Sequence, residues 1–216
     1  MGLIIERSTL RFTYGKSPLL QFLLTLGIAE ILREGIQIVW GRRTKRFDIP
    51  EWGQTSVDFF LFTYPGYRVF VMVTTILLML ALYLFLNRTD TGIVIRAAYY
   101  DRDTTNTLGI NVSRVFSITF VVGAGMAGVA GALIGPIRAV SPTLGVELLI
   151  PAFVVVIIGG LGSIRGSIVG GLLVGQIIVI SGQFYPAYSQ VLVFLSMAIV
   201  LLVRPRGLFG KEGMFD

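Results

Sequence analysis

The chain has 216 residues, of which 54% are hydrophobic and only 14% are charged. A soluble domain usually carries about 25% charged residues, so this composition excludes an ordinary water-soluble surface. The net charge of +6 does not indicate nucleic acid as a partner, because Lys and Arg lie mainly between and beside long apolar runs. The composition predicts an integral membrane protein of all-α, polytopic type.

The first apolar segment covers residues 19–40 and contains three charged residues, Glu30, Arg33 and Glu34. Their spacing of three or four places them on one helix face, where each glutamate can pair with the arginine. Such charges can line a polar path or can lie near the membrane interface or in a protein-packed groove. We favour the second interpretation, because the cluster falls in the outer half of the segment.

A polar, turn-rich stretch follows over residues 41–68, with a basic run at 42–46 and a possible short hairpin. Residues 69–86 carry no charge and predict the clearest transmembrane helix. The chain then becomes polar over residues 87–114, where we expect a short amphipathic helix over 96–111 that ends at a glycine C-cap, Gly109.

Residues 115–136 predict another span, and its small residues recur four apart, as in helices that pack closely through Gly128 and Gly131. The formal G-x-G-x-x-G at 123–128 does not indicate a dinucleotide site, because it lies inside an unbroken apolar run. The same pattern recurs further along the chain at Gly166 and Gly170 and, on the neighbouring row, at Ser167, Gly171 and Gly175.

The apolar stretch 148–181 is too long for one span, and glycines break it at 159–166 into pieces of roughly 12 to 16 residues. A broken or re-entrant helix follows, since irregular backbone survives at membrane depth only where protein or a cavity covers it. We expect this break to line or gate a translocation path or, as an equal alternative, only to permit a sharp bend. The residues assigned to the path are Gly159, Gly160, Gly162, Ser163 and Arg165, with Arg165 at the cytoplasmic mouth. A last span covers 189–203.

The distribution of Lys and Arg predicts a cytoplasmic C-terminus, although the basic run at 42–46 argues against it. One side would hold the N-terminal segment, residues 87–114 and the C-terminal tail. That side carries Arg7, Arg11, Lys16, Arg88, Arg96, Arg102, Arg114, Arg204, Arg206 and Lys211, against Arg42, Arg43, Lys45, Arg46, Arg68 and Arg138 on the other.

Catalytic and ATP-binding motifs are missing from the sequence. It contains no G-x-x-x-x-G-K-[ST] motif, no G-x-S-x-G elbow and no H-E-x-x-H. Cys and His are both absent, which excludes disulfides, a thiolate nucleophile and the commonest zinc ligand. We therefore expect neither an enzyme nor a metal or cofactor in this chain.

Residues 89–112 carry the pattern T-x-x-G-x-x-x-R-A-A-x-x-D-R-x-x-x-x-x-L-G-I-N-V. This resembles the coupling segment of the branched-chain amino-acid ABC permeases, closest to the LivH type, with the urea permeases (UrtB type) as a near relative. Further landmarks agree in order: Ile5-Glu6-Arg7, Leu24–Gly27, Ala127–Gly131, Ser141-Pro142, Gly159–Gly166 and Leu202–Gly210.

The resemblance implies a single permease domain over residues 1–216, lacking the family's N-terminal segments, with a cytoplasmic coupling loop at 87–114. It implies that Arg96, Ala97, Ala98, Asp101, Arg102, Asp103 and Gly109 contact an ATPase. The implied partners are a second permease subunit, two cytoplasmic ATPases that use ATP, an external substrate-binding protein and membrane lipid, in a bacterial-type cytoplasmic (inner) membrane.

The substrate stays open between branched-chain amino acids, other amino acids, short amides and urea. An ion-coupled secondary carrier, which would use the Glu30, Arg33 and Glu34 group, and a membrane scaffold are the rival classes. The coupling-like segment argues against the carrier, and the break at 159–166 argues against the scaffold.

Overall fold

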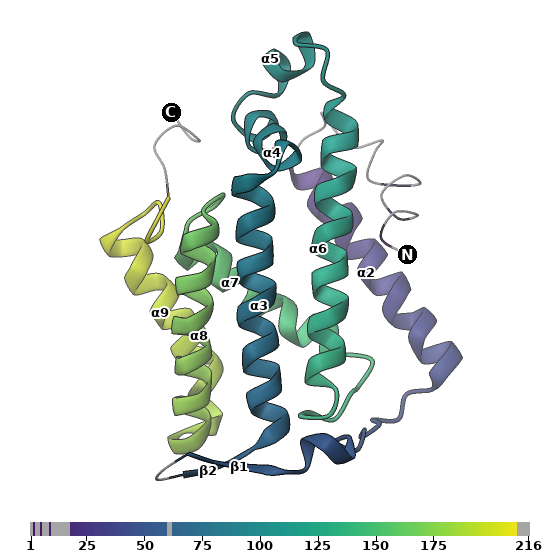
Figure 1. Cartoon of the computed structure of the whole chain (residues 1–216), viewed down its shortest axis with the longest axis vertical. Coiled ribbons are helices and arrows are strands. Elements are labelled where there is room, and N and C mark those ends of the chain that lie inside the picture. Colours follow the sequence, from purple (N-terminus) through teal and green to yellow (C-terminus); the bar gives the residue numbers. More distant parts are fainter. Residues whose placement is uncertain (1, 3–4, 6–8, 10–17, 60–61, 211–216) are drawn as a thin grey trace. The chain divides into compact units, whose positions relative to one another are not determined.

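The computed structural model describes residues 2, 5, 9, 18–59 and 62–210, and helices dominate it (Figure 1). Among these residues, four helical stretches are long and apolar enough to cross a membrane: Gly66–Arg88, Val112–Ile134, Ile164–Phe184 and Pro186–Val203. The predicted all-α, polytopic membrane fold is confirmed. The predicted landmark residues Glu6 and Arg7, and the cations Arg11, Lys16 and Lys211, lie outside the described residues.

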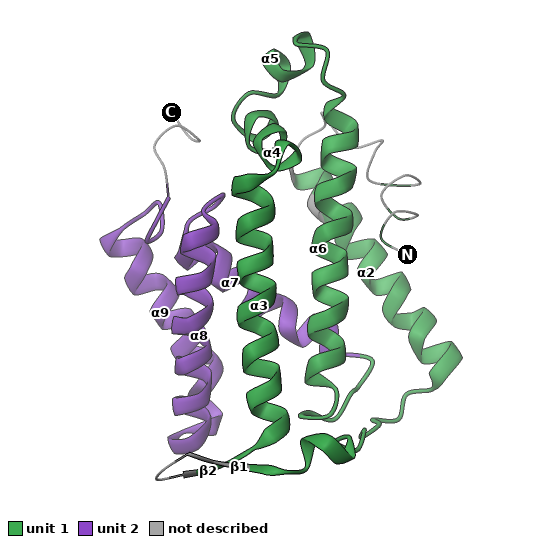
Figure 2. Ribbon diagram, viewed as in Figure 1, with its two compact units in different colours: residues 1–142 green, residues 143–216 purple. Residues whose placement is uncertain are grey.

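The chain divides into two compact units, residues 1–142 and 143–216 (Figure 2). Unit 1 begins with α2 (Pro18–Trp40), which matches the predicted apolar segment. Its 23 residues give a length of about 35 Å, enough to cross the hydrocarbon core of about 30 Å. It is not among the four most apolar helices, because every stretch of 18 residues within it contains the three charged residues.

A short ordered connector joins α2 to the next helix. It contains the 3₁₀ turn η2 (Glu51–Gly53) and an antiparallel hairpin of β1 (Ser56–Phe59) and β2 (Phe62–Pro65), as the turn-rich sequence suggested. Trp52 packs edge-on against Phe70, with ring centroids 4.8 Å apart. Lys45 and Val140 exchange two backbone hydrogen bonds of 2.8–2.9 Å, which tie the connector to the end of unit 1.

The remainder of unit 1 consists of α3 (Gly66–Arg88), α4 (Asp90–Tyr100), α5 (Arg102–Thr107) and α6 (Val112–Ile134). The Tyr67 hydroxyl donates to the Leu133 carbonyl over 3.1 Å, so the start of α3 lies beside the end of α6. These two helices therefore run in opposite directions, as Figure 1 shows. At their other end, α4 and α5 form the link, and Ala98, Val112 and Val115 make a small buried core.

Unit 2 contains α7 (Leu144–Gly159), α8 (Ile164–Phe184), the turn η3 (Pro186–Tyr188) and α9 (Ser189–Val203). Its core comprises Val154, Ile158, Val174 and Val193. The predicted break is present at residues 160–163, and α7 with 16 residues is shorter than a full crossing.

The predicted length of the second piece is wrong, because α8 has 21 residues and is long enough to span a membrane. The Ser163 hydroxyl accepts a hydrogen bond of 3.1 Å from the Gly166 N–H. This N-cap starts the helix at Ile164, before the last glycine of the break. The helix then continues beyond Ser181 to Phe184.

Candidate functional site

The segment 87–114 forms two helices, so the predicted single helix over 96–111 is wrong. The chain breaks at Asp101, whose backbone is extended (φ −147°, ψ 100°). Its carboxylate accepts hydrogen bonds from the Thr104 N–H (3.0 Å) and the Thr104 hydroxyl (2.5 Å). Asp at this position is a strong N-cap, so capping of α5 competes successfully with continuation of α4.

The same hydrogen bonds lower the pKa of Asp101 below its ordinary value, the Thr104 side chain contributing most and its backbone N–H next. Because the pKa is lowered in the folded segment, the cap stabilises the fold at every pH above the ordinary pKa of an aspartate. The contribution is lost as acid takes the pH down through the lowered pKa. The cap of α5 is therefore complete at neutral pH.

The inner side of this segment holds it onto α3 and α6. Ala98 is 3% exposed and packs against Val112 and Val115. The Arg96 guanidinium donates to the Asn87 side-chain oxygen over 2.5 Å, which joins α4 to the end of α3. Of the residues assigned to ATPase contact, Ala98 is thus buried within unit 1 and Arg96 has a partner inside the chain.

The outer side of the segment is exposed and includes the other assigned residues, Ala97, Asp101, Arg102, Asp103 and Gly109. The Arg102 guanidinium lies over the Phe116 ring, 5.5 Å from its centroid, and fixes α5 against α6. Gly109 ends α5 with a left-handed backbone (φ +82°), as its predicted capping role requires.

Sequence reasoning missed the large exposed side chains of this segment, of which Tyr100 and Leu108 are the most exposed. Tyr100 is 63% exposed and Leu108 is 74% exposed. A shallow hollow of about 420 Å³ on this segment is lined by Arg102, Asn106, Gly109, Ile110, Asn111, Val112 and Ser113. Leu108 stands between a polar run and Gly109, and this position could have indicated an exposed apolar side chain at the end of the segment.

In unit 2, the break at 160–163 is the turn of a tight antiparallel helix pair. An added Cβ at Gly166 would lie only 1.9 Å from the Gly159 carbonyl oxygen, and one at Gly170 would lie 2.7 Å from the Val155 oxygen. Gly159 and Gly160 are buried, whereas Gly162 and Arg165 are exposed. The backbones of α7 and α8 therefore touch directly at these glycines.

The C-terminal tail, residues 204–210, covers this turn. The Leu208 N–H donates to the Ile158 carbonyl (2.8 Å) and the Phe209 N–H donates to the Gly159 carbonyl (3.0 Å). These bonds satisfy two carbonyls at the end of α7 that the helix itself leaves unpaired. Leu208 also packs against the core of unit 2. The glycine break at 159–166 and the C-terminal motif at 202–210 thus belong to one structural feature.

These contacts give Gly159 and Gly160 a packing role, and Ser163 caps α8. The part of Gly159, Gly160, Gly162, Ser163 and Arg165 in a translocation path stays a prediction. The helix-packing role of Gly128, Gly131 and Gly175 also stays a prediction, because a Cβ at any of them would meet nothing within 4 Å. At Gly171, the nearest atom is a Val155 methyl carbon at 3.7 Å.

Gly207→Ala is expected to destabilise unit 2 well beyond the effect of Gly41→Ala. Both glycines have a left-handed backbone, with φ of +79° and +84°, so alanine is strained by about 1–2 kcal/mol at either position. A Cβ at Gly207 would also lie 2.6 Å from Gly160 Cα, whereas Gly41 has open space. Thermal unfolding in detergent measures both losses, and equal losses would contradict the docked tail.

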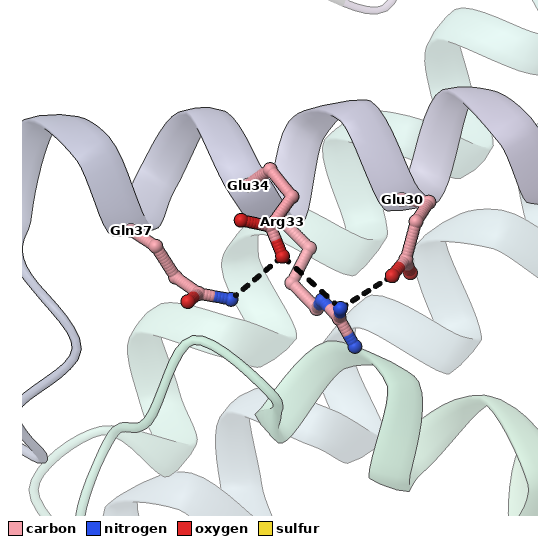
Figure 3. A network of polar contacts seen from close by, with 4 residues as sticks. All are labelled: Glu30, Arg33, Glu34 and Gln37. Atoms are coloured by element: carbon pink, nitrogen blue, oxygen red, sulfur yellow. Dashed lines mark hydrogen bonds and ion pairs between the residues drawn. The ribbon is translucent and has the colours of Figure 1, made fainter.

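In α2, the expected ion pairs are confirmed (Figure 3). The Arg33 guanidinium pairs with both Glu30 and Glu34, the latter over 3.1 Å, and Gln37 donates to Glu34 over 3.4 Å. All four side chains lie on one side of the helix (Figure 3). Glu30 and Glu34 are 54% and 47% exposed, so this polar group is accessible.

Comparison with known proteins assigns these features to a family. Residues 1–201 match the family described as branched-chain amino acid transport system / permease component. The high-affinity branched-chain amino acid transport system permease protein BraD of Pseudomonas aeruginosa is 32% identical over 219 residues, covering 97% of this chain and 70% of that protein. LivH of Escherichia coli is 32% identical over 215 residues with the same coverage.

A relative with lower identity is also similar to this chain in sequence. The probable branched-chain amino acid transport permease protein LivH of Methanocaldococcus jannaschii is 28% identical over 198 residues, covering 88% of this chain and 61% of that protein. No solved structure matches the chain. The match over residues 1–201 and the 32% identity over 97% of the chain show that it belongs to the branched-chain amino acid transport permease family.

Proposed function

We propose that the chain is the membrane-spanning permease subunit of an ATP-driven importer for branched-chain amino acids. The observation that carries the proposal is the 32% identity, over 97% of the chain, to permeases named for high-affinity branched-chain amino acid transport. The sequence has no ATP-binding motif, so the energy has to come from partner ATPases. A second permease subunit and an external binding protein complete the importer.

The exposed side of α4 and α5 is the surface proposed to dock on the ATPase. It presents charged residues, Arg102 and Asp103, beside the large side chains Tyr100 and Leu108. The fixed inner side, buried around Ala98, gives this surface a rigid connection to α3 and α6. A docking surface that transmits movement needs such a connection, because a loosely attached loop would absorb the movement.

The proposed topology places α4 and α5 in the cytoplasm and the connector between α2 and α3 outside a bacterial inner membrane. In support, the backbone bridge between Lys45 and Val140 keeps the connector and the end of α6 at the same end of unit 1. In unit 2, the hydrogen bonds from Leu208 and Phe209 keep the tail at the same end as the turn 160–163. A cytoplasmic C-terminus therefore implies that this turn is cytoplasmic too.

Uptake into proteoliposomes tests the proposed function. The chain is reconstituted with two partner ATPases and a second permease subunit, and a binding protein is added outside with labelled leucine. Leucine uptake is expected with ATP inside the vesicles and is expected to stop when the catalytic glutamate of the ATPase is replaced. Competition with isoleucine, valine and urea then ranks the substrates.

Two outcomes of this experiment would contradict the proposal. Uptake driven by an ion gradient in the absence of the ATPases would identify a secondary carrier. ATP-dependent uptake of urea that leucine does not inhibit would assign the chain to short amides.

A further inference from the structure

The polar group on α2 lies close to the middle of the helix. Because α2 extends over Pro18–Trp40, Glu30 lies one residue from the midpoint of the helix. Arg33 and Glu34 lie about 5 and 6 Å beyond Glu30 along the helix axis, at a rise of 1.5 Å per residue. We infer that α2 crosses the membrane, which places all three inside a hydrocarbon core of about 30 Å; the interfacial or protein-packed position favoured from the sequence stays the alternative prediction.

The polar side of α2 occupies only one half of the helix. Glu30, Glu34 and Gln37 follow one another along the same face (Figure 3), and Gln37 lies three residues before the end of α2 at Trp40. Toward the other end, this face continues with Leu23, Leu26 and Gly27, which are exposed. A polar stripe that starts at mid-membrane and opens at one end is suited to a solute that enters from that end.

The charges of this stripe do not balance. Two carboxylates share one guanidinium, and among the described residues no other cation lies within ion-pair distance of either. The stripe thus has one excess negative charge at a depth where an uncompensated charge is costly. A ligand with a positive group would compensate it.

The arginine, too, has unused capacity. Its Nη2 contacts both glutamates, whereas the other terminal nitrogen, Nη1, has no contact in Figure 3. The Nε also lacks a partner among the described residues, but it is buried and cannot reach a ligand. The guanidinium therefore retains donors that the two glutamates do not satisfy. Such donors match the geometry of a carboxylate.

We propose that Glu30, Arg33 and Glu34 form a membrane-embedded site for the zwitterionic head of an α-amino acid on its way through the permease. This inference rests on the importer function proposed above and restricts the substrate to solutes that carry both charges. The two glutamates hold the ammonium group and Arg33 holds the carboxylate. The substrate side chain lies against Leu23 and Leu26, where Gly27 leaves room because a Cβ there would meet nothing within 4 Å.

Neutral urea and short amides fit this site poorly. They carry no ammonium group to compensate the excess negative charge, and their binding would leave both glutamates competing for one arginine. Charge complementarity thus separates amino acids from the alternative substrates, which overall family membership does not.

Thiol labelling tests the site without depending on transport, because the chain has no native Cys. Gln37→Cys places a thiol on the stripe, and Val39→Cys, two residues on, places one at similar depth on the opposite side of the helix. In membranes containing the assembled importer, we expect a water-soluble reagent to label Gln37→Cys and not Val39→Cys. Leucine supplied with the binding protein is expected to slow this labelling.

The charge of the site gives a second readout. The ratio of labelling rates for a quaternary-ammonium reagent and a sulfonate reagent at Gln37→Cys is expected to fall about tenfold when Glu34→Gln is added, as for loss of one partly buried unit charge. Equal labelling at positions 37 and 39, or an unchanged ratio, would overturn the site.

Uptake separates failure of this inference from failure of the proposed function. Wild-type protein that imports no amino acid in the presence of its partners refutes the importer, whatever the labelling shows. If the double variant Glu30→Gln/Glu34→Gln takes up leucine at the wild-type rate, the zwitterion site is refuted and the importer function is not. Loss of subunit assembly in that double variant, with Gln37→Cys unreactive in the complex, would instead identify the stripe as a subunit interface and also overturn the proposal.

Discussion

Gly166→Leu is expected to abolish folding of unit 2 and, with it, recovery of the protein from the membrane. The added Cβ would lie 1.9 Å from the Gly159 oxygen, which is backbone and cannot rotate away. Separating α7 from α8 would also remove the contacts among Val154, Ile158 and Val174 that form the core. Overpacking costs about 1–3 kcal/mol where side chains can adjust, so the loss here should exceed that range. Yield of folded protein by size-exclusion chromatography in detergent measures it.

Gly175→Leu is the matched control on the same helix. A Cβ at Gly175 meets nothing within 4 Å, so the isolated chain should unfold at nearly the wild-type temperature. The spacing of Gly175 predicts helix packing without naming the partner; if that partner is a second permease subunit, this variant will fold and then fail to assemble. Equal folded yields for Gly166→Leu and wild type would contradict the contact between α7 and α8.

The contrast between these glycines shows what the sequence of unit 2 could predict. The recurrence of small residues four apart correctly indicated close packing on α8 at Gly166 and Gly170. It could not distinguish that row from the neighbouring row of Gly171 and Gly175. The partner of each row is decided by the direction in which α7 returns, which depends on the turn at 160–163.

The docked tail could not have been predicted from local patterns at all. Leu208 and Phe209 donate to carbonyls about fifty residues earlier in the chain, and no periodicity links positions so far apart. The family resemblance pointed to both the break at 159–166 and the C-terminal motif, but it did not show that they contact each other.

The apolar pattern, in contrast, predicted the bounds of α3, α6 and α9 closely, since hydrophobic runs of that length have few alternatives.

In the segment 87–114, the sequence predicted a helix and its glycine end but missed the break. Helix propensity and amphipathic spacing are weak over so few residues, and a single Asp–Thr pair outweighs them. Likewise, the pattern at 30–34 predicted the ion pairs of Arg33, because residues three or four apart share a helix face.

Replacing Asp101 and Arg102 together by Ala is expected to lower ATP-dependent uptake about tenfold or more, in the range of typical coupling energies. ATP hydrolysis by the assembled complex should continue. The double variant removes the α5 cap and the stacking on Phe116, so the proposed docking surface loses its shape. Membrane insertion should be unchanged, since neither residue lies in a spanning helix.

Two further variants separate shape from charge in this segment. Asp101→Asn retains an oxygen that can accept from the Thr104 N–H, so it keeps the cap while removing the negative charge. If the cap is what matters, this variant should restore most of the uptake that Asp101→Ala loses. Glu51→Ala/Arg68→Ala, which removes an exposed acid and an exposed base at the other end of unit 1, should leave uptake unchanged. Normal uptake in Asp101→Ala/Arg102→Ala would show that the ATPase docks elsewhere. An equal loss of uptake in Glu51→Ala/Arg68→Ala would show that the effect is not specific to α4 and α5.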